Sequence, residues 1–257
     1  MRCAALVLLL AISPAVAMTP GGIPGVLPAG VLPDCLGDPA LTVPVRAGAD
    51  AVLQLPQGKA VLAGIVLPGA KFDPPSRWGA IAAVRMQELT RAPLMLYPAG
   101  DPDRYGRQPV QAVADGIWLQ GDLIERGLAR VDPASGACTT TLYAIEQSAR
   151  LHHAGLWADP AYAVRPPEGA LPGQFQIIEG RVLTVAKKDG RLFLNFGADW
   201  KTDFTVTVAP ADMRRFRHAH LDPMTLAGRR VRVRGIVERY HGPEIVLAGP
   251  EGLEVLP

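Results

Sequence analysis

The chain has few cysteine and histidine residues. It contains 3 cysteines and 5 histidines in 257 residues, which argues against a disulfide-rich scaffold and against a Cys/His zinc cluster. Two histidine pairs, His152 with His153 and His218 with His220, lack the i, i+4 spacing of a helical metal site. The sequence also has no phosphate-binding glycine loop, no Ser/His/Asp set and no Cys-x-x-Cys motif. These absences argue against several large classes of enzyme.

Charge of one sign and long apolar runs are also scarce. The formal net charge is only +2, so no strong overall field steers the protein to DNA. The apolar run ALVLLLAI near the N-terminus is shorter than the about 20 residues that a membrane-spanning helix needs. Arg2 precedes this run and Ala15-Val16-Ala17 follows it, a pattern typical of a signal peptide over residues 1–17. An uncleaved anchor is the alternative. We therefore expect an exported protein, periplasmic or extracellular, with no membrane span in the mature chain.

The remaining cysteines indicate a disulfide. Cys3 leaves with the signal segment, and export places Cys35 and Cys138 in an oxidising compartment, where such a pair tends to be bridged. The bridge would tie the N-terminal arm to the loop before the last helix of the first domain. A bridge that closes a loop of about a hundred residues stabilises the folded state by roughly 4–5 kcal/mol, because it reduces the conformational entropy of the unfolded chain. Two separate buried thiols are the alternative.

Composition and turn residues divide the chain into segments. Hydrophobic residues make up 49% and charged residues 19%, a globular composition, and the 25 prolines and 27 glycines indicate short strands and many turns. Residues 18–40 are dense in Pro and Gly and predict an extended arm without regular structure. A first domain over 41–164, a proline-rich linker over 165–173 and a second domain over 174–257 follow.

Periodicity predicts short strands and three helices in the first domain. The strands LTVPV, DAVLQL and KAVLAGIVL are followed by a helix over 76–91 with Ser76 as its N-cap. The strands PLMLYPAG and PVQAVADGIWL come next, the second turning at Asp115-Gly116. Two further helices are expected over 119–128 and 139–157. This order fits a small closed β-barrel with helices packed on it.

The second domain reads as a second barrel. Its predicted elements are a hairpin over 175–197 turning at 188–190, a strand over 203–210, a short helix over 211–221 and a hairpin over 228–248 turning at 241–243. Three strands, a helix and two strands is the order of an OB-fold barrel. The predicted fold class is therefore mainly β with helices (α+β), with two OB-fold-type five-stranded barrels in series.

Three segments carry a resemblance to a known family. The stretch VLAGIVLPG at 61–69 matches the pattern Arg-Leu-x-Gly-Ile-Asp-x-Pro-Glu at Leu, Gly, Ile and Pro. Residues 103–131 contain Tyr-Gly-Arg, an Asp-Gly hairpin and Gly-Leu-Ala-x-Val, and residues 146–160 contain Ala followed by Gly-x-Trp. Together, over about 41–160, they resemble the staphylococcal-nuclease (thermonuclease) family. The second domain resembles the small C-terminal OB-like domain that accompanies nuclease-like domains in some bacterial secreted proteins.

The resemblance implies a calcium-dependent phosphodiesterase site, from which three groups are missing. In the family, carboxylates hold calcium, a glutamate activates water and two arginines stabilise the transition state. The family's first arginine falls on Val61, its second metal-binding aspartate on Val66 and its glutamate on Gly69. Only the first aspartate, Asp50, and the second arginine, Arg107, remain.

These losses predict a protein without hydrolytic activity. Valine cannot bind a metal and glycine cannot accept a proton, and loss of the general base alone costs about 10²–10⁴ in rate. No catalytic residue, cofactor or metal site is therefore assigned, and Asp50 and Arg107 are interpreted as remnants.

Structural roles suit both remnants. Arg107 is expected to pair with Asp101 or Asp103, and Asp50 to hydrogen-bond its own turn. The alternative is a weak or altered calcium-dependent nuclease in which Asp73, near Arg77, acts as a relocated carboxylate beside the two remnants.

The second domain carries the predicted binding surface. Residues 175–257 hold 13 Lys and Arg against 10 Asp and Glu, a net charge of +3. Arg230, Arg232 and Arg234 alternate on one strand face. The aromatic residues that could stack on bases are Phe193, Phe196, Trp200 and Tyr240. Such a surface suits single-stranded nucleic acid or another polyanion, while an envelope-protein partner is a further alternative. The competing interpretation is a solvated face whose arginines pair with Glu179, Glu238 or Glu244, with Phe193 in the core.

Overall fold

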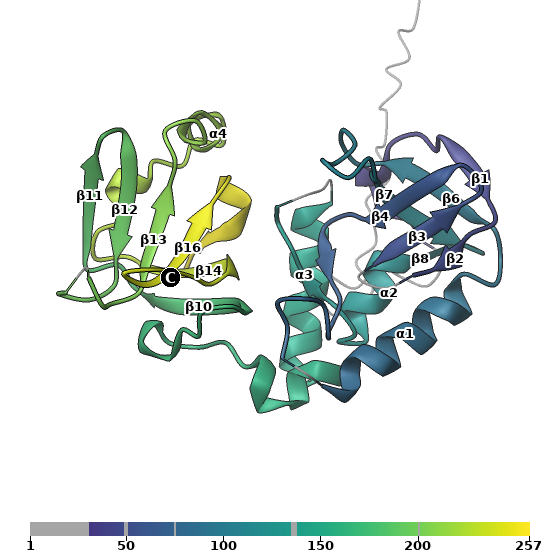
Figure 1. The fold of residues 1–257 in the computed structure, drawn as a ribbon, viewed down its shortest axis with the longest axis horizontal. Coiled ribbons are helices and arrows are strands. Elements are labelled where there is room, and N and C mark those ends of the chain that lie inside the picture. The colour runs from purple at the N-terminus through teal and green to yellow at the C-terminus, as the bar shows by residue number, and fades with distance from the viewer. Residues whose placement is uncertain (1–30, 49–50, 75, 135–137, 200) are drawn as a thin grey trace, which may run out of the picture.

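The computed structural model describes residues 31–48, 51–74, 76–134, 138–199 and 201–257. The predicted signal segment, most of the Pro/Gly-rich arm, Asp50 and Trp200 lie outside these residues. Figure 1 shows two β-rich units side by side, joined by the segment between helix α3 (Thr139–Leu151) and strand β10 (Phe175–Arg181). In this view, helices lie below the strands of the first unit and on its side that faces the second unit.

The described part of the first unit contains nine strands, most of which belong to one curled sheet. They are β1 (Leu41–Val43), β2 (Arg46–Ala47), β3 (Val52–Leu55), β4 (Gly58–Leu62), β5 (Ile65–Val66), β6 (Leu94–Pro98), β7 (Gln108–Ala114), β8 (Ile117–Trp118) and β9 (Arg130–Val131). The sheet order is β1-β6-β7-β4-β3-β2, and β1 and β2 are consecutive parts of one chain segment, which closes the barrel. The pair β4·β7 is parallel, whereas the other pairs in the cycle are antiparallel. The expected hairpin at Asp115-Gly116 is confirmed by the pairing of β7 with β8.

Three helices cover this barrel. They are α1 (Arg77–Leu89), α2 (Leu119–Glu125) and α3 (Thr139–Leu151), with 3-10 turns η1 (Asp34–Leu36), η2 (Gly155–Ala158) and η3 (Pro160–Tyr162). A further 3-10 turn, η4 (Pro167–Gly169), contacts β10 (Phe175–Arg181) of the second unit. α1 buries Ala82, Met86 and Leu89, one face of a helical period. Ser76 precedes α1 as expected, but its hydroxyl makes a hydrogen bond of 2.6 Å with the hydroxyl of Tyr162 in place of a cap. The end of the arm is not extended throughout, because η1 forms there and buries its leucine.

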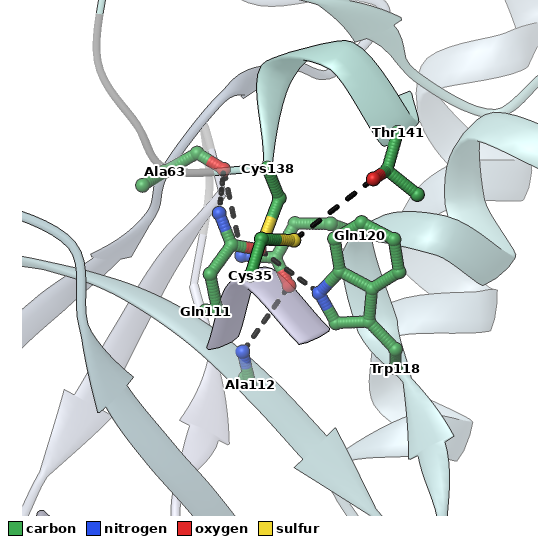
Figure 2. The surroundings of a disulfide bond; sticks show 8 residues. All are labelled: Cys35, Ala63, Gln111, Ala112, Trp118, Gln120, Cys138 and Thr141. Atoms are coloured by element: carbon green, nitrogen blue, oxygen red, sulfur yellow. Dashed lines mark hydrogen bonds between the residues drawn. A yellow bond between two sulfur atoms is a disulfide. The ribbon is translucent and has the colours of Figure 1, made fainter. Parts of the chain in front are cut away.

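The predicted disulfide between Cys35 and Cys138 is confirmed. Their Cα atoms lie 5.2 Å apart and their sequence separation is 103. The bridge fastens η1 to the residue before α3. Figure 2 shows it beside a buried polar group, in which Gln111 accepts from the indole of Trp118 at 2.9 Å and donates to the backbone oxygen of Ala63 at 3.3 Å. The bridge therefore fastens the end of the arm to the first unit, in whose core Leu36 is buried.

The second unit repeats the same pairing cycle. Its elements are β10 (Phe175–Arg181), β11 (Thr184–Lys188), β12 (Arg191–Asn195), β13 (Thr205–Val208), α4 (Met213–His218), η5 (Pro223–Thr225), β14 (Arg230–Ile236), β15 (Glu238–Tyr240), β16 (Gly242–Leu247), η6 (Pro250–Gly252) and β17 (Leu253–Val255). The order β11-β12-β13-β16-β15 continues through β14 to β10, which precedes β11 in the chain. Here too one pair, β13·β16, is parallel. This is the connection pattern of an OB-type barrel. The short strand β17, which pairs with β14, was not expected.

Each unit has its own hydrophobic core. One cluster of buried side chains runs from Leu36 to Ile145 and the other from Ala170 to Leu253. The expected class, mainly β with a few helices, is confirmed. Within the described residues, no helix is long and apolar enough to cross a membrane.

A buried ion pair joins the two units. Arg234 of β14 places Nη1 2.7 Å from Oε2 of Glu146 in α3, and Nη2 2.7 Å from Oε1 of Glu254 in β17. The other oxygen of Glu146 accepts from the backbone N–H of Val131 at 2.8 Å. The guanidinium also lies 4.2 Å from the ring centroid of Tyr143. These groups come from both units, so the ion pair lies at the contact between the two barrels.

Candidate functional site

Strands β4 and β5 and the turn after them, residues 67–70, carry the positions of the missing catalytic groups. Val61, on β4, lies between Val52 of β3 and Pro109 of β7. Val66, on β5, pairs with Arg130 of β9. Both valine side chains are half-buried. At these two positions the first barrel presents apolar groups that neither bind a cation nor stabilise a phosphate.

The backbone of the turn suits glycine at the position of the family's glutamate. Gly69 has φ +80°, in the left-handed region, where a side chain is strained. Helix α1 approaches the turn closely, since a Cβ on Gly79 would lie 2.8 Å from the backbone oxygen of Pro68. The turn is therefore adapted to close packing, and a glutamate at position 69 would meet an unfavourable backbone.

Asp73, which could have replaced a missing carboxylate, is used for another purpose. Its side chain is fully buried and forms an ion pair with Arg130, and its second oxygen accepts from the backbone N–H of Gly69 at 3.1 Å. Burial raises the pKa of Asp73, against the opposing effects of Arg130 and of the Gly69 N–H. The Asp73 carboxylate therefore stabilises the turn through Gly69 and fixes the side chain of Arg130.

Arg130 is a residue that sequence reasoning missed. Nη1 of Arg130 donates to the backbone oxygen of Phe175, the first residue of the second barrel, at 2.8 Å. Its guanidinium lies 4.8 Å from the ring centroid of Phe175 and 5.1 Å from that of Tyr162. The backbone N–H of Phe175 donates to the oxygen of Phe72 at 2.7 Å. The loop between the turn and Asp73, together with Arg130, therefore holds the start of β10 against the first unit.

Arg107 occupies a local ion pair. Its Nε lies 2.7 Å from Oδ2 of Asp103, and its backbone N–H donates to Oδ1 of the same carboxylate at 3.0 Å. Tyr105 N–H donates to Oδ1 as well, at 2.8 Å. Of the two partners expected from the sequence, Asp103 is the one found. These hydrogen bonds lower the pKa of Asp103, so the pair is charged at neutral pH.

The arginine row of the second unit is largely neutralised. Arg230 lies 2.5 Å from Glu179, and Arg232 lies 2.9 Å from the same residue. Arg232 also reaches Glu254 at 3.3 Å. The expectation that Arg234 faces a ligand needs correction, because only 2% of this residue is exposed. The alternation along the strand predicts that the three arginines share one face, but it cannot show that this face contacts α3 at Arg234.

A groove lies on the other sheet of the second barrel. Its volume is about 1030 Å³. Along β12, Leu192 and Leu194 point into the core, while Arg191, Phe193 and Asn195 line the groove. The same alternation continues on β13 and β16, and the turns after β11 and β15 form the two ends. The groove therefore spans the face of the sheet opposite the core.

The floor of the groove contains a buried carboxylate. Glu244 of β16 is 7% exposed, and it accepts a hydrogen bond from the hydroxyl of Thr207. Arg191 donates to the same hydroxyl at 3.4 Å. Tyr240, at one edge, is 69% exposed. Phe193 thus lines the groove, whereas Phe196 packs on Phe204 at 5.1 Å between ring centroids.

The described residues include no group of three or more His, Cys, Asp or Glu side chains placed to hold a metal ion. Asp50 lies outside the described residues. The arrangement around the turn is thus one of apolar contacts and engaged ion pairs, whereas the groove offers donors, acceptors and rings to a ligand.

Comparison with known families identifies the first unit. Residues 59–159 match the family described as staphylococcal nuclease homologue. A search of curated proteins found no match. The matched range contains the turn, Arg107 and helices α1 to α3. The chain therefore carries, over residues 59–159, a domain of the staphylococcal nuclease homologue family with an OB-type fold.

Proposed function

We propose that this protein is an exported binding module that no longer hydrolyses phosphodiester bonds and that takes its ligand in the groove of the second barrel. The family indicates a nuclease or a nucleic-acid-binding module. One observation carries the choice between them, namely the residues at the three positions where the family has its catalytic groups. Val61 and Val66 supply no charge, and Gly69 adopts a backbone that disfavours a glutamate.

The chemistry of hydrolysis requires groups that are engaged or absent. Metal-assisted attack needs a bound cation, a base and charge stabilisation at the phosphate. Asp73 and Arg107 are bound to Arg130 and Asp103 respectively. Recruiting either of them to a phosphate would break an existing ion pair. Binding without hydrolysis needs none of these rearrangements.

Export is supported by the disulfide together with the sequence of the first 17 residues. A bridge between Cys35 and Cys138 forms and persists in an oxidising compartment. Mass spectrometry of the secreted or periplasmic protein, with and without reductant, tests both parts of this proposal. A chain that begins at residue 1 and carries free thiols in cells would contradict it.

A cleavage assay tests the loss of hydrolysis. The chain from residue 18 onward is incubated with calcium and with single-stranded DNA, duplex DNA or RNA, and the Arg107→Ala variant, purified identically, serves as the matched control. We expect no cleavage above the buffer rate with either protein. Cleavage that is removed by a calcium chelator and by Arg107→Ala would instead support the alternative, a weak calcium-dependent nuclease. Cleavage that is equal in both preparations comes from a contaminant.

A further inference from the structure

We propose that the groove of the second barrel binds an uncharged oligosaccharide. This inference rests on the binding role proposed above and specifies the class of ligand. It depends on three features of the groove, which are the balance of charge along its lining, the hydrogen-bonding groups on its floor and the positions of its aromatic rings.

The charge of the lining disfavours a polyanion. The groove contains two cations, Lys188 and Arg191, and three carboxylates, Asp189, Glu238 and Glu244. Nucleic-acid surfaces are dominated by Lys and Arg that neutralise phosphates. The arginines that could supply such a surface are on β14, outside the lining, and are paired with glutamates. A phosphate chain in the groove would therefore approach more negative than positive charge.

The floor of the groove suits hydroxyl groups. Glu244 is buried, yet it belongs to no ion pair among residues 31–48, 51–74, 76–134, 138–199 and 201–257. A buried carboxylate is costly unless donors surround it. A sugar hydroxyl can donate to Glu244 and accept from Arg191, whereas a phosphodiester oxygen can only accept. Thr207 already links these two groups in the same manner.

The groove recognises its ligand through side chains. The backbones of β12, β13 and β16 are engaged in the sheet ladder, so an extended peptide cannot pair with them as it would with an exposed strand edge. The polar groups on the floor include Asn195 and Thr205. Such a set of donors and acceptors matches a ligand that carries hydroxyl groups along its whole length.

Two rings provide apolar platforms. Phe193 is on β12 and Tyr240 on β15, separated in the sheet by β13 and β16. At about 4.8 Å per strand, this corresponds to about 14 Å along the sheet. Pyranose rings have apolar C–H faces that pack on aromatic rings. The separation favours a chain of several sugars over a single sugar, because both rings can then be covered at once.

Isothermal titration calorimetry with defined probes tests the proposal. The probes are cellohexaose, chitohexaose and maltohexaose, with the oligonucleotide dT12 and a mixed-sequence hexapeptide as comparators. We expect at least one hexasaccharide to bind, with an affinity that stays constant between 50 and 200 mM salt, because an uncharged ligand releases no counterions. Tyr240→Ala should weaken this binding about 10-fold.

Tyr105→Ala is the matched control. Tyr105 is 70% exposed, almost the same as Tyr240 at 69%, but it lies in the first barrel, so its replacement should leave the affinity unchanged. The proposal is wrong if no hexasaccharide binds, if dT12 or the hexapeptide binds more tightly, or if both tyrosine variants lose affinity equally. The cleavage assay on the same preparations keeps the two questions separate. Absence of sugar binding without cleavage rejects only the ligand class, while calcium-dependent cleavage rejects the proposed function.

Discussion

The ion pair between Arg234 and Glu146 allows a quantitative test of how the two barrels are joined. The charged atoms are 2.7 Å apart, and the side chains are 1% and 0% exposed. Burial alone would lower the pKa of Arg234, but Glu146 and Glu254 raise it above its ordinary value, so the guanidinium stays charged. Arg234→Met would leave the Glu146 carboxylate buried without its counterion. Breaking a buried pair in this way costs about 3–5 kcal/mol.

Arg230→Met is the matched control for this experiment. Arg230 is on the same strand and pairs with Glu179 at 2.5 Å, but 57% of its side chain is exposed. Glu179 also keeps Arg232 as a partner. An exposed pair of this kind contributes about 0–1 kcal/mol. Urea unfolding followed by circular dichroism should therefore separate the two variants clearly, provided that the slopes of the transitions agree.

The double variant Arg234→Met/Glu146→Leu shows whether the cost comes from the unpaired charge. Removing both charges should recover part of the loss. A residual cost of about 1–3 kcal/mol is expected, because the N–H of Val131 loses its acceptor. If Arg234→Met and Arg230→Met destabilise the protein equally within about 1 kcal/mol, the pair does not join the barrels in the way inferred here.

Three further predictions concern the first barrel. Cys35→Ser or Cys138→Ser should lower the free energy of unfolding by about 4–5 kcal/mol in the chain-entropy interpretation, and reductant should then have no further effect on the urea midpoint. Burial would raise the pKa of Asp122, but hydrogen bonds from Arg85 and Arg126 lower this pKa below its ordinary value of 3.8 in the folded protein. The resulting stabilisation is present above pH 3.8 and is lost as the pH falls through the lower folded-state pKa. Asp122→Asn should therefore flatten the acid limb of a plot of unfolding free energy against pH. Gly69→Glu, at φ +80°, should cost about 1–3 kcal/mol and should yield no calcium-dependent cleavage of DNA.

Much of the fold follows from local sequence patterns. The alternation of Leu192 and Leu194 with Arg191 and Phe193 identifies a strand with one face in a core, and the structure places it so. The hairpin at Asp115-Gly116 follows from a turn pair that accepts positive φ, and both residues have it. By contrast, short strands such as β9 and β17 have no periodicity of their own. They exist because neighbouring strands offer unpaired backbone groups.

The site was harder to predict because it depends on contacts between distant residues. Three alternating arginines are a visible pattern, and the sequence could name Glu179 as one partner. It could not show that Arg234 meets Glu146, which is 88 residues away and in the other unit. Arg130 gave no signal at all, since a single arginine after a short helix is unremarkable. The groove became visible only when the outward residues of separate strands were brought together.

The two barrels share a pairing cycle, so their parallel strand pairs can be compared. On the parallel pair of the first barrel, Val61 lies opposite Pro109. On the parallel pair of the second, Thr205 lies opposite Glu244, a carboxylate on the floor of the groove. The first parallel pair thus has an apolar pair of residues there, whereas the second has a polar pair on the groove floor.

The contact between the units makes this division of roles difficult to reverse. Val66 pairs with Arg130, and Arg130 binds both Asp73 and the first residue of the second barrel. A carboxylate introduced at position 66 would lie on the strand that positions this anchor, and one at position 69 would strain the turn that Asp73 holds. Substitutions that restore the missing groups would therefore act against the interface. Ligand chemistry is accordingly expected in the second barrel, with the first serving as its support.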